Sequence, residues 1–309
     1  MAITTNVSIL CSFDGVTDRK QNPAYDEAVF ALSIVIAVLS PITVTGNVLI
    51  VAVIWRNRTW RTPFYMLLCG LALTDLSTGL IIQPFYVASQ FICLEGPQEI
   101  EGRQKFLVLA RVITGGFGTY LIYMTVLILT CMSIERWLQM SRRFLFVQRR
   151  EHFIVAGIIL APIPFSVFRT LNNLTGSYKH VLTISLAFLL LCVIAISISY
   201  FKVIRIIRCH RQQVQARETS QISGQPVINL AKYKKSVIFI LYIVLLFYIS
   251  YAPFIVFFGI YRSLRDHSVV ELAYVMALTS VFLSSSLNPV IYIWRMNDIR
   301  NGVKQLIWK

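Results

Sequence analysis

A single carboxylate lies deep inside an apolar stretch of this sequence. It is Asp75, in the segment LALTDLSTGL. A charged carboxylate at the centre of a membrane-spanning helix costs about 2.5–3.5 kcal/mol on insertion scales, and ionisable residues in such places are usually functional. Two interpretations stay open for Asp75 alone: a neutral, hydrogen-bonded carboxyl group that holds helices together, or a site for a cation or a proton that changes with the state of the protein.

A second polar cluster interrupts the last apolar stretch, in SSSLNPVIYIW at 284–294. Proline in the interior of a helix removes a backbone donor and clashes with the preceding turn, which costs about 3 kcal/mol or more. Inside lipid, the carbonyl groups that are freed in this way need hydrogen-bond partners from the protein itself. The stretch is therefore either not a membrane span or a functional part of one.

The composition shows which elements must position these residues. Of the 309 residues, 56% are hydrophobic and only 14% are charged, and the mean hydropathy is +0.67. Soluble domains have about a quarter of charged residues, so this composition predicts a membrane protein. A helix needs about 20 mostly apolar residues to cross a bilayer. Seven stretches meet this need: 28–56, 63–93, 106–139, 152–169, 180–208, 233–261 and 268–294. We expect an all-α membrane protein with one bundle of seven helices.

The distribution of charge predicts the orientation of the bundle. The segment before the first span and every second connection after it form one side, which holds nine Lys/Arg and nine Asp/Glu. The other side holds 20 Lys/Arg and four Asp/Glu. Because basic residues gather in short cytoplasmic loops, the N-terminus is expected outside and the C-terminus inside. The basic balance thus reflects membrane topology, with anionic membrane lipids as partners of the inner face, and no nucleic-acid partner is expected.

Polar and proline motifs follow one another along the spans, each in a different helix. At this point the chain resembles the rhodopsin-like (class A) G-protein-coupled receptors, from about residue 30 to its end. The residues that carry the resemblance are Asn47, Asp75, Glu135-Arg136, Phe247-x5-Pro253 and Asn288-Pro289-x2-Tyr292.

The resemblance implies a receptor that passes an extracellular ligand signal to heterotrimeric G proteins by a two-state helix rearrangement, with Pro253 as the bend point of the sixth span. Arg136 would pair with Glu135 in one state and be released in the other, whereas a bare acid–base pair at a helix end could simply extend toward water. The residues implied in coupling and activation are Glu135, Arg136, Tyr200, Phe247, Tyr251, Pro253, Pro289 and Tyr292.

By the same resemblance, a set of oxygen-bearing side chains would form a polar pocket for an allosteric sodium ion, the only cofactor expected. Oxygen ligands suit such a hard cation. The set consists of Asp75, Thr125, Ser284, Ser285 and Asn288.

The sequence also departs from the family pattern. Arg111 stands at the position of the usual extracellular cysteine of span three, and the loop at about 170–179 has no cysteine, so the usual disulfide cannot form. In lacking this disulfide, the chain resembles the melanocortin-like, lipid and cannabinoid receptor groups. A Cys11–Cys93 bridge is one pairing that an oxidising exterior allows, although sequence does not fix connectivity. Asn6, in the sequon Asn6-Val7-Ser8, is a candidate glycosylation site.

The ligand is left open as a small molecule, a lipid or a peptide. Gly118 stands where amine receptors place their aspartate, so a biogenic amine is disfavoured. The last span has no lysine, so retinal cannot be held as a Schiff base. The glycines around Gly118 either leave room beside a ligand or serve close helix packing. The candidate pocket residues are Gly118, Thr119, Ile122, Phe254, Phe258, Tyr274 and Phe282.

The predicted organisation is an extracellular tail at 1–27, a seven-helix receptor domain at 28–294 and a cytoplasmic amphipathic helix at 295–309, in a multi-pass plasma-membrane protein. The main alternative is a seven-helix protein without G-protein coupling, acting as a decoy or scaffold. A transporter is less favoured, because no repeat symmetry or polar pathway is evident. An enzyme is not expected, because the sequence shows no set of catalytic residues within the spans.

Overall fold

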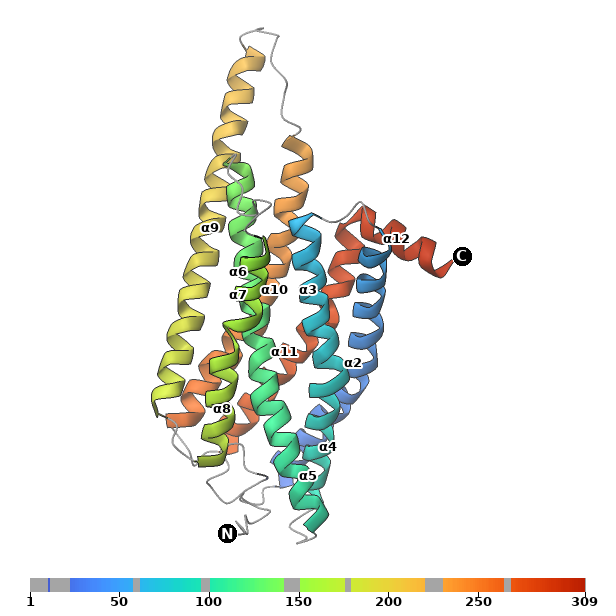
Figure 1. Cartoon of the computed structure of the whole chain (residues 1–309), viewed down its shortest axis with the longest axis vertical. Coiled ribbons are helices and arrows are strands. Elements are labelled where there is room, and N and C mark those ends of the chain that lie inside the picture. Colours follow the sequence, from blue (N-terminus) through green and yellow to red (C-terminus); the bar gives the residue numbers. More distant parts are fainter. Residues whose placement is uncertain are drawn as a thin grey trace.

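The computed structural model describes residues 11, 23–57, 62–95, 101–141, 151–175, 179–219, 230–263 and 268–308. Within these residues all regular secondary structure is helical, and the long helices run up and down side by side (Figure 1). Six of the described helices are long and apolar enough to cross a membrane, and a further one has a shorter apolar stretch at Leu241–Phe257. The prediction of an all-α bundle of seven membrane helices is confirmed.

The first span is the single helix α2. The second and third spans each consist of two α-helical pieces joined by one π-helical turn. The remaining spans continue the up-and-down arrangement of the bundle. The elements are α2 (Pro23–Arg56); α3 (Pro63–Ser77), η2 (Thr78–Ile82) and α4 (Gln83–Leu94); α5 (Glu101–Arg111), η3 (Val112–Phe117) and α6 (Gly118–Met140); α7 (Glu151–Leu160) and α8 (Ile163–Thr175); α9 (Lys179–Thr219); α10 (Leu230–Ser263); α11 (Ser268–Arg295); and α12 (Asn297–Ile307).

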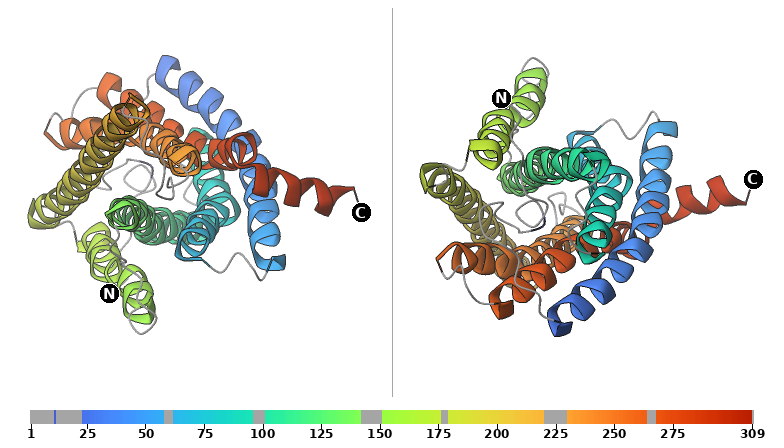
Figure 2. Two further views of the ribbon diagram at one scale, coloured as in Figure 1. Left: turned by 90° about the horizontal axis from the view of Figure 1, so that it is seen from above. Right: turned by 90° about the horizontal axis from the view of Figure 1, so that it is seen from below.

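The two ends of the bundle differ in shape. At the end that carries α12, which the charge pattern predicts to be cytoplasmic, α9 extends beyond the other helices (Figure 1). Seen along the bundle, the spans surround a common centre and α12 projects outward from it (Figure 2). Ile299 and Val303 of α12 are buried, whereas its charged residues Asp298, Arg300 and Lys304 are exposed. The last helix is therefore amphipathic, which suits a helix lying on the inner leaflet.

The bundle buries polar as well as apolar side chains and turns large apolar ones outward. One hydrophobic cluster joins α2, α3, α6, α9, α10 and α11 through residues such as Leu71, Leu129 and Phe247. Leu191 and Phe201 of α9 are 66% and 68% exposed, as expected of side chains that face lipid. The polar residues of the sequence motifs must therefore find their partners within the bundle.

The glycines of η3 are used for close helix packing at Gly116. The Ser166 hydroxyl of α8 donates a hydrogen bond to the Gly116 carbonyl at 2.8 Å. A Cβ atom at position 116 would overlap the Oγ1 atom of Thr170, also in α8. Of the two roles predicted for these glycines, the packing role is therefore the one that applies to Gly116.

This contact makes a first prediction. Gly116→Ala is expected to lower stability by about 1 kcal/mol, because the new methyl group displaces the Thr170 hydroxyl or separates η3 from α8. Gly157→Ala is the matched control, since nothing lies within 4 Å of a Cβ atom there, and it should be neutral or stabilising by up to about 1 kcal/mol. Thermal unfolding midpoints of the detergent-solubilised variants test this. Recovery in Gly116→Ala/Thr170→Ala would locate the clash, and equal midpoints for the two single variants would contradict it.

Candidate functional site

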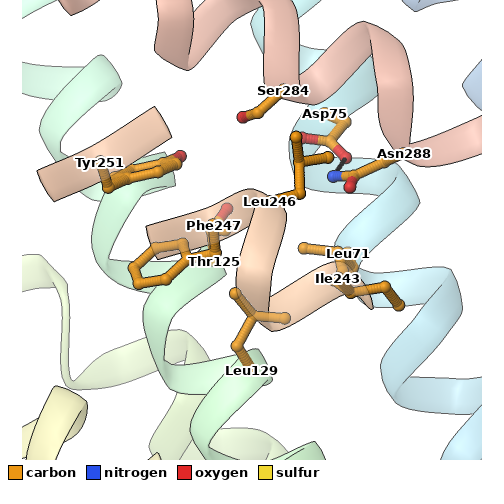
Figure 3. Close-up of a pocket in the computed structure, with 10 residues that line it drawn as sticks. All are labelled: Leu71, Asp75, Thr125, Leu129, Ile243, Leu246, Phe247, Tyr251, Ser284 and Asn288. Atoms are coloured by element: carbon orange, nitrogen blue, oxygen red, sulfur yellow. Dashed lines mark hydrogen bonds between the residues drawn. The ribbon is translucent and has the colours of Figure 1, made fainter. Parts of the chain in front are cut away.

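The lone intramembrane carboxylate is hydrogen-bonded to the last span. The Nδ2 atom of Asn288 in α11 donates to Oδ2 of Asp75 in α3 at 2.7 Å (Figure 3). The two residues are only 7% and 3% exposed. A hydrogen bond of this kind is worth more where water is excluded than it is in water. Asp75 therefore faces into the bundle and joins α3 to α11.

The carbonyl that Pro289 leaves without its helical partner is that of Ser285, four residues earlier. The Nδ2 atom of Asn47 in α2 donates to this carbonyl at 3.2 Å and to that of Thr43 at 2.9 Å. Asn47 thus supplies from another helix the donor that the proline removes. This pairing explains how the stretch at 284–294 can be a membrane span.

Turns next to two other prolines are also contacted by hydroxyl groups of neighbouring helices. The Ser280 hydroxyl of α11 lies 3.0 Å from the Ser250 carbonyl of α10, one residue after the Ile249 carbonyl that Pro253 leaves without its helical partner, and 2.6 Å from the Ala277 carbonyl of its own helix. The Ser40 hydroxyl of α2 donates to the Gly79 carbonyl at 2.8 Å. Gly79 lies in η2, where a π-helical bond would reach five residues on, to a proline that has no N–H. Each irregular turn is therefore joined to a neighbouring helix by a side-chain donor.

A small cavity lies between α3, α6, α10 and α11, next to the Asp75–Asn288 bond (Figure 3). The cavity brings four of the five residues predicted for the polar pocket together with two of the predicted activation residues. Its walls are formed by Leu71, Asp75, Thr125, Leu129, Ile243, Leu246, Phe247, Tyr251, Ser284 and Asn288.

Ser285, the fifth predicted pocket residue, is not among the residues that line this cavity. It is buried, and its carbonyl is the one that Asn47 binds. Thr125 is linked to α3, because its hydroxyl donates to Oγ1 of Thr74 at 3.2 Å. A further contact joins α2 to α11, where the hydroxyls of Thr43 and Ser286 are 2.6 Å apart.

The remaining predicted activation residues lie along the inner half of the bundle. Glu135 is buried near the cytoplasmic end of α6, and Arg136 beside it is half-buried. Tyr292 is fully buried in α11, and Tyr200 in α9 is half-buried. On the extracellular side of these residues, the rings of Phe247 and Tyr251 stack with centroids 4.4 Å apart, and Pro253 follows within α10.

The candidate ligand-pocket residues fall into separate groups. Gly118 adjoins Ile82, and Phe282 contacts the Tyr86 ring at a centroid distance of 5.6 Å. The rings of Phe254 and Tyr274 form another contact, at 5.5 Å.

The other members of that set are more dispersed. The Thr119 hydroxyl donates to the Gly115 carbonyl of its own helix. Ile122 packs against the main hydrophobic cluster. Phe258 lies in α10, but its side chain is outside the described ones.

On the outer side, Cys11 and Cys93 are joined by a disulfide with Cα atoms 5.4 Å apart. Both cysteines pack against Leu107 of α5. The disulfide therefore joins Cys11 to α4, next to α5. Asn6, the candidate glycosylation site, lies outside the described residues.

Comparisons with known proteins agree with this arrangement. The family model of the 7 transmembrane receptors (rhodopsin family) matches residues 46–171 and 167–292. The histamine H2 receptor of Homo sapiens is 23% identical over 303 residues, covering 89% of this chain and 79% of that protein. G-protein coupled receptor 3 of Mus musculus is 22% identical over 294 residues, covering 90% and 81%. A crystal structure of squid rhodopsin superposes with a TM-score of 0.73 at 17% identity, covering 94% of this chain and 88% of that one.

A bundle of seven membrane helices with its polar residues buried between the spans defines a multi-pass receptor of the plasma membrane. The chain belongs to the rhodopsin family of seven-transmembrane receptors, and it is a G-protein-coupled receptor.

Proposed function

We propose that this receptor signals by switching between two arrangements of its helices, and that the polar contacts around Asp75 distinguish the two. The observation that carries this proposal is the cavity at the Asp75–Asn288 bond. Phe247 and Tyr251 of α10 form part of the wall of that cavity. A movement of α10 therefore changes the surroundings of the only deep carboxylate.

The hinge of this movement is Pro253, where the backbone hydrogen bonds of α10 are broken. On the cytoplasmic side of Pro253, α10 swings outward and opens a crevice beside Arg136 for a G protein. An extracellular ligand that binds the open state more tightly shifts the population toward it. Moving the ratio of open to closed from 1:99 to 99:1 needs about 5.5 kcal/mol of differential binding. A G protein that favours the open state raises ligand affinity in return.

We further propose that the cavity holds a sodium ion in the closed state. The donor set fits such an ion, since carboxylate and hydroxyl oxygens line the cavity and hard cations prefer oxygen ligands. Asp75, Thr125 and Ser284 would hold it, with Asn288 fixing the carboxylate. The ion would supply a positive charge beside Asp75, where the described residues place no Lys or Arg in the cavity wall.

For the ligand, we propose a molecule other than a biogenic amine. Gly118 has no side chain to pair with an ammonium group, and its neighbour across the helix interface is the apolar Ile82. The contacts of Tyr86 with Phe282 and of Phe254 with Tyr274 make the outer half of the bundle aromatic. These features favour a largely apolar ligand, in keeping with the lipid, cannabinoid and melanocortin-like groups suggested by the sequence.

Ligand-independent recruitment of a panel of G proteins in cells tests the proposed function. Wild type is expected to recruit at least one G protein, and Arg136→Ala at equal surface expression is expected to lose this recruitment, because the guanidinium that contacts the partner is gone. An equal response of the two receptors across the whole panel would favour the decoy or scaffold alternative.

A further inference from the structure

The guanidinium group of Arg136 is held by two residues outside the family motif. Its Cζ atom lies 4.0 Å from the centroid of the Phe64 ring, which is the geometry of a cation–π contact. Its Nη1 atom donates to Oε1 of Gln139 at 2.9 Å. The face of the guanidinium is therefore covered by a ring from α3, and one edge by an amide from α6.

Gln139 also fixes the acidic member of the motif. Its Nε2 atom donates to Oε1 of Glu135 at 2.8 Å. One amide thus bridges Glu135 and Arg136, accepting from the base and donating to the acid. Because Glu135 is only 2% exposed, this bridge works where water does not compete strongly.

Phe64 is itself well anchored. The residue is 7% exposed, and α3 begins at Pro63, a residue favoured at the first position of a helix. The next side chain, Tyr65, donates its hydroxyl hydrogen to Oδ2 of Asp298 in α12 at 3.1 Å. The ring that covers Arg136 therefore belongs to an element that is tied to α12 by this hydrogen bond.

We infer that Phe64 and Gln139 are positioning residues that hold the Arg136 guanidinium in the closed arrangement, through the Phe64 ring face and the Gln139 bridge to Glu135. This inference rests on the proposed function, in which Arg136 turns toward the G protein. Arg136 must leave both the ring and the amide to do so. Weakening either contact therefore raises ligand-independent signalling.

The test for Phe64 varies the electrostatics of the ring without changing its packing. Phenylalanine analogues with one, two and three ring fluorines are incorporated at position 64, because fluorine progressively removes the negative charge from the ring face. Basal recruitment of the G protein that wild type recruits is expected to rise stepwise, by about five-fold for the trifluorinated ring. The same series at Phe201, on the outer face of α9, is the control and should have no effect.

Substitutions at position 64 separate the effect of the aromatic ring from the effect of side-chain size. Phe64→Leu should raise basal recruitment as the trifluorinated ring does, and Phe64→Tyr, which keeps a ring with a negative face, should restore the wild-type level. A purely structural role would be disturbed by Phe64→Leu but not by fluorination. Gln139→Met, which keeps the length of the side chain but removes the bridge, should also raise recruitment by about five-fold or more.

The outcomes distinguish the two proposals. If Arg136→Ala abolishes recruitment but the fluorinated series at position 64 and Gln139→Met leave it unchanged or lower it, this inference is wrong and the proposed function stands. If Arg136→Ala has no effect on any G protein, the proposed function fails, and this inference fails with it.

Discussion

Asn288→Asp is expected to be the most damaging single substitution in the polar centre of the bundle. It places a second carboxylate where an amide now donates to Asp75 at 2.7 Å. The donor is lost, and two buried carboxyl groups repel each other unless one takes up a proton. Leaving a buried polar group without its partner costs about 1–3 kcal/mol, and more when the group is charged, so we expect a loss of about 3 kcal/mol.

Exchange of the two residues tests the cause. Asp75→Asn/Asn288→Asp restores one amide and one carboxylate, and it should recover most of the thermal unfolding midpoint and surface expression that Asn288→Asp loses. Asp75→Asn alone is the matched control: its two amides can still bond to each other, so it should cost only about 1 kcal/mol. A double variant that is as unstable as Asn288→Asp would show that the bond between positions 75 and 288 is not what stabilises the bundle here.

Much of the architecture could be predicted because membrane helices obey simple constraints of length and charge. Seven apolar stretches, and a bias of basic residues to one side, were enough to expect the bundle. The π-helical turns η2 and η3 were not predicted. One extra residue in a turn shifts which face a side chain occupies, but in a helix that is apolar all round no pattern records the shift.

The need for partners at the prolines could be predicted, but not the partners themselves. Ser40 bonds to a carbonyl of a neighbouring helix, and Ser280 bonds both to a neighbouring helix and to Ala277 of its own. Thr130 and Ser133 bond to carbonyls of their own helix, at Val126 and Leu129. A hydroxyl group in a membrane helix can donate to a carbonyl of its own helix or of a neighbouring one. Its presence in the sequence therefore does not indicate which carbonyl it binds. Only Asn47 stood out from the sequence, because it was part of a motif.

The residues of the candidate site also differed in how well the sequence could predict their roles. Asp75 and Asn288 are rare residues in an apolar setting, and the structure brings them together. Phe64 and Gln139 gave no signal, since a phenylalanine is ordinary in a membrane helix and a glutamine is ordinary at a helix end. The contact of Phe64 with Arg136 depends on where α3 begins and on its packing against α6, which are properties of the folded bundle. Gln139 lies in the same helix as Arg136, three residues on, so helical spacing alone brings the two within reach.

The packing of α2 against α11 makes the last prediction, which concerns Gly46. A Cβ atom at position 46 would lie 3.0 Å from both Cβ and Cγ of Pro289. The proline ring is rigid and has no other rotamer that would make room. A larger residue must therefore push α2 away from α11, and the next residue along α2 is Asn47, whose bond to the Ser285 carbonyl would lengthen or break.

Gly46→Leu is accordingly expected to cost about 3 kcal/mol and to lower the unfolding midpoint in detergent by about 5–10 °C. Gly157→Leu is the control, because a Cβ atom there meets nothing within 4 Å. It should be neutral or stabilising by up to about 1 kcal/mol, because leucine also favours a helix over glycine. An equal drop in the two variants would mean that a leucine in place of glycine lowers stability anywhere in these membrane helices, and that contact between position 46 and Pro289 is not the cause.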